Sequence, residues 1–428
     1  MPKKILIISY YWPPSGGSGV QRWVYFAKYL KQAGYEPIVL TVDPKKATYP
    51  SVDDSLLDDI AGIQTIHTDS FEPLQIYSKL VSGSKKEAVP FGSVDTKGKS
   101  LVKKIPAFIR GNLVLPDARK YWKRYALGEA RKLIQQENIE IVITTGPPHS
   151  THLIGLDLKK EFQLPWIADF RDPWSEIFYN KDLYRTKWAK KKDRKMESAV
   201  LLEADAVLAI SPHTAALLYP KMVDSTKVHC ILNGFEKEKF ESIEITKNKH
   251  FTIAYVGYLG KHHLHTPFTE GLNAFCKQQE DTIQLHLAGT IEAPILADWK
   301  SIHNLNIIHE GVVPHQRAIE IMASADLLFL SIPISEYAKG NIPGKLLEYL
   351  ATGKPIVLVG EDDSDAATLT KQFPNNLVLS KENNQKFIEF CEQVKNNALP
   401  QRKIAEGLEN FTRKETTNQL IQVIERIS

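Results

Sequence analysis

Cysteine is scarce in this chain of 428 residues, and its three cysteines lie far apart. Cys230, Cys276 and Cys391 form no Cys-x-x-Cys motif and no Cys/His pairing at metal-ligand spacing. This distribution argues against a disulfide framework and against a structural zinc site, and it favours a reducing compartment. The sequence therefore predicts a cytoplasmic protein.

Long apolar runs are also missing. No run reaches the roughly 18 apolar residues that a membrane-spanning helix needs. The apolar stretch at residues 5–8 follows two lysines, but it is too short for a signal peptide and breaks into Tyr-Tyr-Trp-Pro-Pro. Hydrophobic residues still make up 43% of the chain, whose length exceeds the usual size of a single core. We expect a globular protein of two domains.

Net charge is small, at +4, but the positive charge is concentrated. Residues 97–124 hold nine basic residues and one acidic residue, and residues 185–195 hold seven basic and one acidic. In 97–124 the basic residues are interleaved with Leu, Ile, Phe, Tyr and Trp, a pattern that suits nucleic acid, an anionic membrane or a phosphorylated acceptor. Because the chain has no RNA-binding signature, we favour the membrane or lipid-phosphate interpretation and expect no nucleic-acid partner. The plainer alternative for both segments is a solvated surface.

Apolar runs of strand length alternate with amphipathic stretches of helical period along most of the chain. The expected strands are 4–9, 37–42, 63–67, 140–144, 165–170, 206–210 and 227–232, then 251–256, 283–288, 305–309, 327–330, 356–359 and 377–379. This alternation predicts an α/β protein built from two doubly wound, Rossmann-like domains. Regular patterning lapses for about fifty residues after 63–67, as expected of a functional or disordered loop.

Residues 236–250 are charged and patternless, so we place the domain boundary there. The prediction is an N-terminal domain at 1–238, a second domain at 250–405, and a terminal helix at 406–428 that crosses back onto the first domain. The first strand leads into a loop with Gly16, Gly17 and Gly19, which lacks the dinucleotide G-x-G-x-x-G spacing. On its own this loop is also compatible with a simple strand-to-helix turn.

Two loops at the ends of predicted strands carry candidate chemistry, because ligands of open α/β sheets bind beyond the carboxyl ends of the strands. His149 follows the strand 140–144 and is a candidate acid/base group toward an acceptor. A metal pair with His152 is disfavoured, since no Asp or Glu joins them at ligand spacing. Arg171 and Asp172 follow the strand 165–170 beside Asp169, where ion pairing within the loop is the alternative.

The segment 341–358, Asn-Ile-Pro-Gly-Lys-Leu-Leu-Glu-Tyr-Leu-Ala-Thr-Gly-Lys-Pro-Ile-Val-Leu, carries the most specific pattern. Pro343 presets a first helical position and Gly344 permits close approach to the backbone, so the start of this helix is a candidate anion site. Lys345 adds a cation, and Glu348 lies one turn further on the same face, where its carboxylate could bridge two hydroxyls. Phosphate at the amides and ribose at the carboxylate describe a nucleoside-diphosphate ligand. A surface turn with solvated charges is the alternative.

Pro-Gly-Lys-Leu-Leu-Glu-Tyr-Leu-Ala-Thr-Gly-Lys-Pro, together with Asp-Phe-Arg-Asp-Pro-Trp, Ile-Leu-Asn-Gly-Phe and Gly-Val-Val-Pro, resembles the motifs of the family-4 retaining glycosyltransferases, in the same order. The resemblance implies the GT-B fold, with a cleft between its two domains and a Glu on the donor ribose at Glu348. Two departures are visible. Gly340 stands where many members have a second Glu, and Tyr258 and His263 stand where members commonly have cations on the leaving diphosphate.

The resemblance also assigns expected roles to several positions. Gly16 and Gly17 would lie against the donor diphosphate or the acceptor, and backbone groups at Val312 and Val313 would meet the base. The cationic role would pass to Lys261, His263 or Lys345. A family His near the reacting centre aligns with Arg171, and whether Arg171 or Asp172 takes its role stays open.

We therefore expect a transferase that moves a sugar from a nucleoside-diphosphate sugar to a saccharide or lipid-linked acceptor, with retention. GT-B enzymes work without metal or other cofactor, and peripheral contact with the anionic inner face of the cell membrane is a further expectation. Two alternatives stay open. A nucleotide-sugar epimerase could share the fold and donor site, and a non-catalytic binding or scaffold protein would account for the missing cations.

Overall fold

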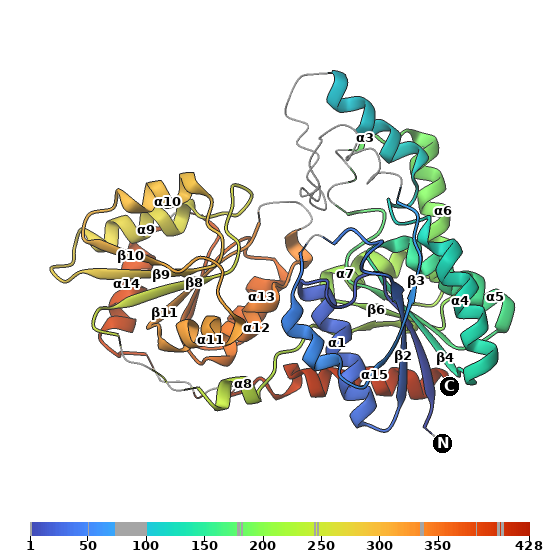
Figure 1. Ribbon diagram of the computed structural model, residues 1–428. Helices are drawn as coiled ribbons and strands as arrows, with labels where there is room; N and C mark the ends of the chain where they lie inside the picture. Colours follow the sequence, from blue (N-terminus) through green and yellow to red (C-terminus); the bar gives the residue numbers. More distant parts are fainter. Residues whose placement is uncertain are drawn as a thin grey trace. The chain divides into compact units, whose positions relative to one another are not determined.

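The computed structural model describes residues 2–49, 51–72, 101–177, 180, 183–243, 245, 248–333, 338–381, 383–399, 403 and 406–428. It divides into two compact units, which we call unit 1 (Met1–Asn233 with Thr416–Ser428) and unit 2 (Gly234–Glu415). Figure 1 shows a parallel sheet in each. The predicted end of the first domain at 238 lies five residues beyond this division and the predicted start of the second at 250 lies sixteen beyond it. The roles given to the two domains stay predictions.

Unit 1 is built on a seven-stranded parallel sheet in the order β3-β2-β1-β4-β5-β6-β7. Its strands are β1 (Lys4–Ile8), β2 (Glu36–Val42), β3 (Gln64–Thr68), β4 (Ile141–Gly146), β5 (Trp166–Phe170), β6 (Ala206–Ala209) and β7 (Val228–Cys230). Its helices are α1 (Ser18–Gln32), α3 (Leu101–Leu113), α4 (Trp122–Glu137), α5 (His152–Phe162), α6 (Lys187–Glu203), α7 (Pro212–Leu218) and most of α15 (Arg413–Ile427). Strands β1, β4 and β5 are buried almost throughout, which explains their continuous apolar sequence.

Unit 2 repeats the arrangement with six parallel strands in the order β10-β9-β8-β11-β12-β13. The strands are β8 (Thr252–Val256), β9 (Ile283–Ala288), β10 (Leu305–His309), β11 (Leu327–Ser331), β12 (Ile356–Val359) and β13 (Asn376–Leu379). The helices are α8 (Glu238–Glu241), α9 (Thr266–Cys276), α10 (Ala293–Lys300), α11 (His315–Ser324), α12 (Gly344–Ala351), α13 (Asp365–Lys371) and α14 (Asn384–Lys395). In its core, Phe268 stacks on Phe329 with ring centroids 3.7 Å apart.

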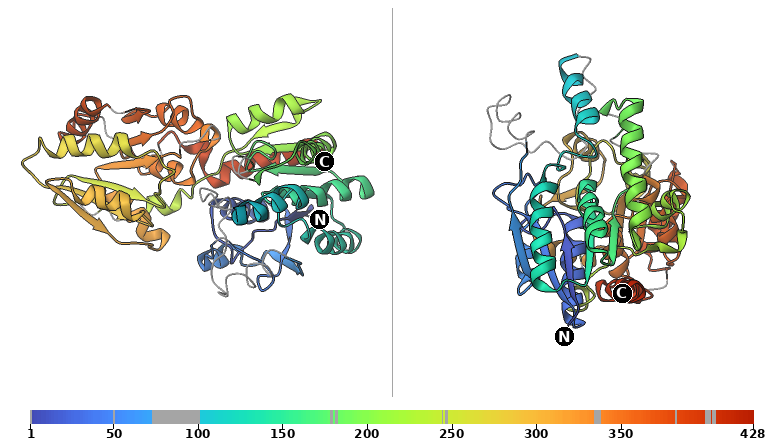
Figure 2. Two further views of the ribbon diagram at one scale, coloured as in Figure 1. Left: turned by 90° about the horizontal axis from the view of Figure 1, so that it is seen from above. Right: turned by 90° about the vertical axis from the view of Figure 1, so that its right-hand side faces the viewer.

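Both strand orders start in the middle of the sheet, run outward to one edge, and then return to the middle and run to the other edge. Right-handed crossovers then place helices on both faces of each sheet (Figure 2). The predicted fold of two doubly wound, Rossmann-like domains is confirmed. The α15 residues Leu420, Val423 and Ile424 belong to the unit 1 core. No helix within the described ranges is long and apolar enough to cross a membrane.

The prediction of an irregular stretch after β3 is wrong in part, because α3 occupies 101–113. Residues 73–100, which include Lys97 and Lys99 of the basic segment, lie outside the described residues. The carbonyl oxygen of Leu183 would lie only 2.1 Å from a Cβ placed on Gly111. Gly111 therefore allows α3 to pack closely against the Leu183 backbone. From the sequence alone, Pro106 and Gly111 look like helix breakers, and this tertiary contact is not apparent.

Candidate functional site

The sheet of unit 2 has its topological switch point between β8 and β11. At such a point the chain leaves two adjacent strands in opposite directions, and ligands bind beyond their carboxyl ends. The loop that begins at Gly257 follows β8, and α12 begins after β11. The two meet: a Cβ built on Gly257 would lie 3.1 Å from Lys345 Nζ, and Gly257 has a φ of +119°. Glycine at 257 thus leaves room for the Lys345 side chain.

Pro343 is the N-cap of α12, with φ −60° and ψ 138°, and Gly344 is the first helical residue. The sequence placed Pro343 one position later, inside the helix; since its ψ is extended, it precedes the helix instead. The first amides of an α-helix lack acceptors within the helix and carry its positive dipole end. Those of Gly344 and Lys345 are therefore placed where an anion could bind, and the anion site predicted from the Pro-Gly-Lys sequence stays a prediction.

Lys345 lies in an unusual environment for a lysine. Its ammonium donates a hydrogen bond to the Tyr255 hydroxyl at 2.7 Å and lies 4.1 Å from the centroid of that ring. Tyr255 in turn donates to the carbonyl oxygen of Tyr258 at 2.6 Å. Burial, with no anionic partner among the described residues, lowers the pKa of Lys345 to about 7. A bound phosphate would supply the missing negative charge.

Glu348 lies one helical turn beyond Lys345. Its Oε1 is 2.9 Å from Nε2 of His315, the first residue of α11, and its side chain is 18% exposed. Its other oxygen, Oε2, has no hydrogen-bond partner among the residues that the structure describes. The sequence analysis missed His315. The available signal was its place directly after the Gly-Val-Val-Pro segment.

The loop after β8 carries Lys261 and His263. Glu292 stabilises the position of this loop, since it accepts hydrogen bonds from the Tyr258 hydroxyl at 2.7 Å and from the Lys261 amide at 3.1 Å. His263 Nδ1 accepts a hydrogen bond from the Gly260 amide at 3.3 Å. Burial and the nearby Lys345 lower the pKa of His263 to about 4, so this imidazole is neutral at pH 7. The cationic role toward the diphosphate stays a prediction for Lys261, His263 and Lys345.

Val312 and Val313 follow β10 at the same edge of the sheet, in the loop that leads into α11. Val312 is 83% exposed, and Gly311 before it has a positive φ of +70°. An exposed loop with backbone groups at the carboxyl end of a strand is compatible with the predicted contact to the base. That role stays a prediction.

In unit 1, the glycines of the first loop are needed for different structural reasons. Gly17 is the N-cap of α1 and has φ +106°, and Gly16 packs so closely that a Cβ would lie 3.0 Å from Cβ of Asp53. Gly19, which the sequence analysis did not single out, faces Arg171: a Cβ there would lie 1.8 Å from its Nη1 atom. The first turn of α1 is thus the surface against which the Arg171 guanidinium lies.

Arg171 also donates through Nε to the carbonyl oxygen of Gly146 at 3.2 Å and through Nη2 to the carbonyl oxygen of Pro147. Its neighbour Asp172 is exposed. Asp169, the third charge of this cluster, is fully buried and accepts hydrogen bonds from Arg22 at 3.1 Å, Trp23 at 2.6 Å and Thr145 at 2.9 Å. Asp169 therefore belongs to the core, where breaking such a buried pair is strongly destabilising.

His149 is buried, at 4% exposure, and not at the surface of a loop. Its ring stacks on Trp174, with centroids 5.0 Å apart and planes 11° apart, and neither ring nitrogen has a hydrogen-bond partner among the described residues. Burial, with the adjacent His152, holds the pKa of His149 well below its usual value. His152 bonds to Thr144 Oγ1 at 2.9 Å, and burial lowers its pKa to about 3. Both imidazoles are neutral at pH 7.

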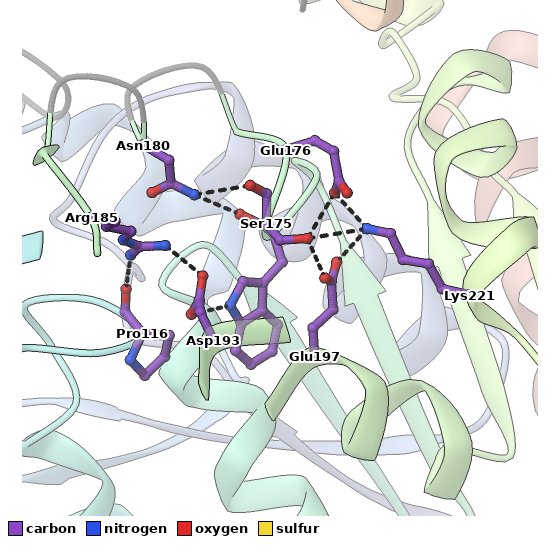
Figure 3. A network of polar contacts seen from close by, with 9 residues as sticks. Pro116, Ser175, Glu176, Asn180, Arg185, Asp193, Glu197 and Lys221 are labelled. Carbon is purple, nitrogen blue, oxygen red and sulfur yellow. Dashed lines mark hydrogen bonds and ion pairs between the residues drawn. The ribbon is translucent and has the colours of Figure 1, made fainter. Parts of the chain in front are cut away.

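A network of hydrogen bonds and ion pairs links the loop after β5 to α6 (Figure 3). Trp174 Nε1 donates to Asp193 of α6 at 2.9 Å, and Arg185 pairs with the other oxygen of the same carboxylate at 2.5 Å. One turn further along α6, Glu197 accepts from Lys221 at 2.8 Å and from Ser175 at 2.5 Å. The loop is therefore fixed to α6, and with it the ring that stacks on His149.

Residues 91–239 match the family model described as Glycosyltransferase Family 4, of which 91–100 lie outside the described part of the chain. The predicted resemblance to the family-4 glycosyltransferases is confirmed over this segment. No curated protein matches the sequence.

Among solved structures, a glycosyltransferase from Rickettsia africae has a TM-score of 0.62 at 14% identity, with 100% of this chain and 98% of that chain covered. Anabaena Alr3699/HepE in complex with UDP has a TM-score of 0.62 at 11% identity, covering 99% and 100%. A putative UDP-N-acetylglucosamine 2-epimerase from Listeria monocytogenes has a TM-score of 0.54 at 12% identity, covering 99% and 96%. At these identities the similarities show a common fold.

Proposed function

We propose that this chain, a glycosyltransferase of GT-B fold with a Glycosyltransferase Family 4 segment, moves a sugar from a nucleoside-diphosphate sugar to a saccharide or lipid-linked acceptor. One observation carries the proposal. At the switch point of unit 2, the start of α12, the partly buried Lys345 side chain and the Glu348 carboxylate lie within one helical turn. Amides and ammonium suit phosphoryl oxygens, and the carboxylate suits neighbouring ribose hydroxyls.

The proposed chemistry needs a stabilised leaving group. As the bond from the sugar to the diphosphate breaks, negative charge grows on the diphosphate and positive charge on the sugar. Fixed donors aimed at the place where charge develops stabilise such a transition state without reorganisation. The Gly344 and Lys345 amides and the Lys345 ammonium would supply that stabilisation. Transfer with retention and without metal is part of this proposal.

On the acceptor side, we assign roles to three residues of unit 1. Burial raises the pKa of the Asp172 carboxyl, although Arg171 opposes this, so the carboxylate can accept a proton from an acceptor hydroxyl, and Arg171 beside it can orient an anionic group. His149 is neutral and lacks other partners among the described residues, so it can exchange one hydrogen bond with an acceptor that reaches it. The basic segment 97–124 supports a cytoplasmic enzyme that works at the inner face of a membrane.

An epimerase acting on the same class of nucleotide sugar is the second candidate, favoured by the fold that the chain has in common with the Listeria structure. A binding protein without activity is the third. Incubation with a panel of nucleotide sugars separates them. Slow release of free nucleotide supports the transferase, an altered sugar on intact nucleotide supports the epimerase, and an unchanged mixture supports the binding protein.

The donor site itself is tested by Glu348→Gln. We expect the affinity for UDP, measured by isothermal titration calorimetry, to fall by roughly 10- to 100-fold, because a hydrogen bond to a charged group contributes about 1.5–3 kcal/mol. Glu320→Gln is the matched control, since Glu320 is an exposed α11 residue paired with Arg317. An unchanged affinity in Glu348→Gln would remove the ribose role from this residue.

A further inference from the structure

Helix α6 separates its charges by sign. Its six basic residues between 187 and 195 are all exposed: Lys187, Lys190, Lys191, Lys192, Arg194 and Lys195. Two of the three acidic residues of α6, Asp193 and Glu197, are each 1% exposed and face the unit 1 interior, and the third, Glu203, ends the helix. Helical spacing places Trp188, Lys191, Lys192 and Lys195 on one face.

The buried acids do not neutralise these exposed cations, because other residues already pair with them. Asp193 pairs with Arg185 and Glu197 pairs with Lys221, as Figure 3 shows. The outward face of α6 therefore presents positive charge without compensating carboxylates of its own. Lys120, after α3, is near enough for the charge of Lys192 to lower its pKa, although burial is the larger cause. Two cations so placed favour an anion between them.

Helix α3 presents apolar side chains to solvent. Phe108 is 47% exposed, Ile109 46% and Leu113 67%, whereas Ala107 on the other face is 1% exposed. The exposed three are spaced so that Ile109 and Leu113 lie one turn apart on one face. Large apolar residues grouped on one surface, rather than scattered singly, indicate an interaction site.

Hydrogen bonds join α3 to the start of α6. Asn112 of α3 donates to the Tyr184 carbonyl at 3.2 Å, and its Oδ1 accepts from the Thr186 amide at 2.8 Å, directly before α6 begins. Figures 1 and 2 show α3 beside the start of α6. At this start, Trp188 is 60% exposed, and Lys192 Nζ lies 5.1 Å from its ring centroid. We call Phe108, Ile109, Leu113, Trp188 and the α6 cations the α3–α6 surface.

We propose that the α3–α6 surface docks on a bilayer of anionic phospholipids, with Leu113 and Trp188 entering the interface and the α6 lysines contacting lipid phosphates. Exposed aliphatic and tryptophan side chains beside clustered lysines are the composition of interfacial membrane-binding elements. Nucleic acid would use the lysines and Trp188, but aliphatic Ile109 and Leu113 offer no stacking surface for bases. The sequence analysis placed membrane contact in 97–124 alone, whereas the structure adds α6 as the main source of charge.

Tryptophan fluorescence provides a direct test on the full chain. Trp188 is the exposed member of seven tryptophans, and the other six are at most 2% exposed: Trp12, Trp23, Trp122, Trp166, Trp174 and Trp299. With vesicles of phosphatidylcholine and phosphatidylglycerol, we expect co-sedimentation, a blue shift of emission, and quenching by lipids brominated on their acyl chains. Pure phosphatidylcholine vesicles should bind far less protein, and added salt should weaken binding. Trp188→Phe should abolish the shift but retain much of the binding.

Variants then identify the surface. Lys191→Glu with Lys195→Glu should lower vesicle affinity by roughly thirtyfold, since each basic residue near an anionic leaflet contributes about 1 kcal/mol. The matched control reverses two exposed lysines of α4 and α5, Lys132→Glu with Lys160→Glu. Leu113→Ser should weaken binding, while Val223→Ser, at a site 89% exposed, should not. All of these side chains are exposed, so unchanged thermal unfolding is expected.

Three results would overturn the inference. The first is binding by the α6 double variant equal to that of its control. The second is co-sedimentation without a Trp188 signal, which would place the membrane contact elsewhere. The third is a labelled single-stranded RNA that binds more tightly than the vesicles and is weakened by the same variants. Because no nucleotide sugar is present, each result leaves the proposed transfer reaction to its own tests.

Discussion

Lys345 shows how burial changes the chemistry of a single side chain. Its pKa of about 7 means that the ammonium is only partly protonated at neutral pH. Because the pKa of the folded state lies below the unfolded value, the unfolded chain binds more protons between about pH 7 and the usual lysine pKa, and stability rises with pH in that window. A diphosphate ligand favours the protonated form, so binding and protonation are coupled.

We therefore predict that UDP affinity falls as the pH rises above about 7, and that binding at pH 8 takes up a proton. Calorimetry in buffers of different ionisation enthalpy measures this uptake. Lys345→Arg is the matched variant, since a guanidinium stays charged throughout this range. It should bind with little proton uptake above pH 7. Equal uptake by both proteins would assign the proton to another group.

Gly19 is the residue-scale feature that the sequence signal did not reveal. It lies within α1 and has no unusual φ, so replacing it with alanine should raise local helix propensity by about 1 kcal/mol. The new methyl group, however, would occupy the position of the Arg171 guanidinium. The gain in helix propensity should stabilise α1, whereas the clash should displace the Arg171 side chain.

We predict that Gly19→Ala lowers the transfer rate at least about tenfold, since a displacement of about 1 Å in a positioned group is enough for losses of this order. Gly128→Ala is the control, because Gly128 lies in α4 with no atom near its potential Cβ. It should match Gly19→Ala in helix propensity and leave the rate unchanged. A fully active Gly19→Ala enzyme would remove Arg171 from the reaction.

At the scale of elements, a hydrogen bond and an ion pair at Asp193 link α6 to the loop after β5. Asp193 connects Trp174 of the loop after β5 with Arg185, which lies just before α6, and all three side chains are nearly inaccessible. Removing one member of a buried ion pair leaves the other charge unpaired in a low dielectric. Helix α6 thus supports the position of the Trp174 ring that stacks on His149.

We predict that Asp193→Ala lowers the free energy of unfolding of unit 1 by about 3–5 kcal/mol, as the loss of one partner of a buried pair does. Urea denaturation followed by far-UV circular dichroism measures the change. The exposed Asp172→Ala should alter stability by no more than about 0.5 kcal/mol. If Asp193→Ala proved as stable as the parent protein, the network would be peripheral to the fold.

At the scale of the whole molecule, the two units differ in how the chain builds them. Unit 2 is one continuous segment with its own core, whereas unit 1 needs the C-terminal residues from 416 onward. Leu420, Val423 and Ile424 are at most 4% exposed in the unit 1 core. Burying each contributes about 1.5–3 kcal/mol, so unit 1 depends strongly on the end of the chain.

We predict that a fragment of residues 234–415 folds alone and binds UDP, with a dispersed amide spectrum in nuclear magnetic resonance. Residues 1–233 alone should have a free energy of unfolding several kcal/mol below that of unit 1. Joining residues 416–428 to residue 233 through a flexible linker should restore that free energy. A fragment 234–415 that stays unfolded would show that unit 2 does not fold without unit 1.

The sequence by itself determined the α/β class, the approximate position of each strand along the chain, and the segment from Pro343 to Glu348 as the donor-site candidate. These features rest on local information, namely apolar periodicity and the chemistry of a helix start. Only the tertiary structure decided which charges are buried. It placed His149 in the core, turned Asp193 and Glu197 inward, brought His315 to Glu348 and set Gly19 against Arg171. Burial and pairing depend on segments far apart in sequence, and no local pattern encodes their contact.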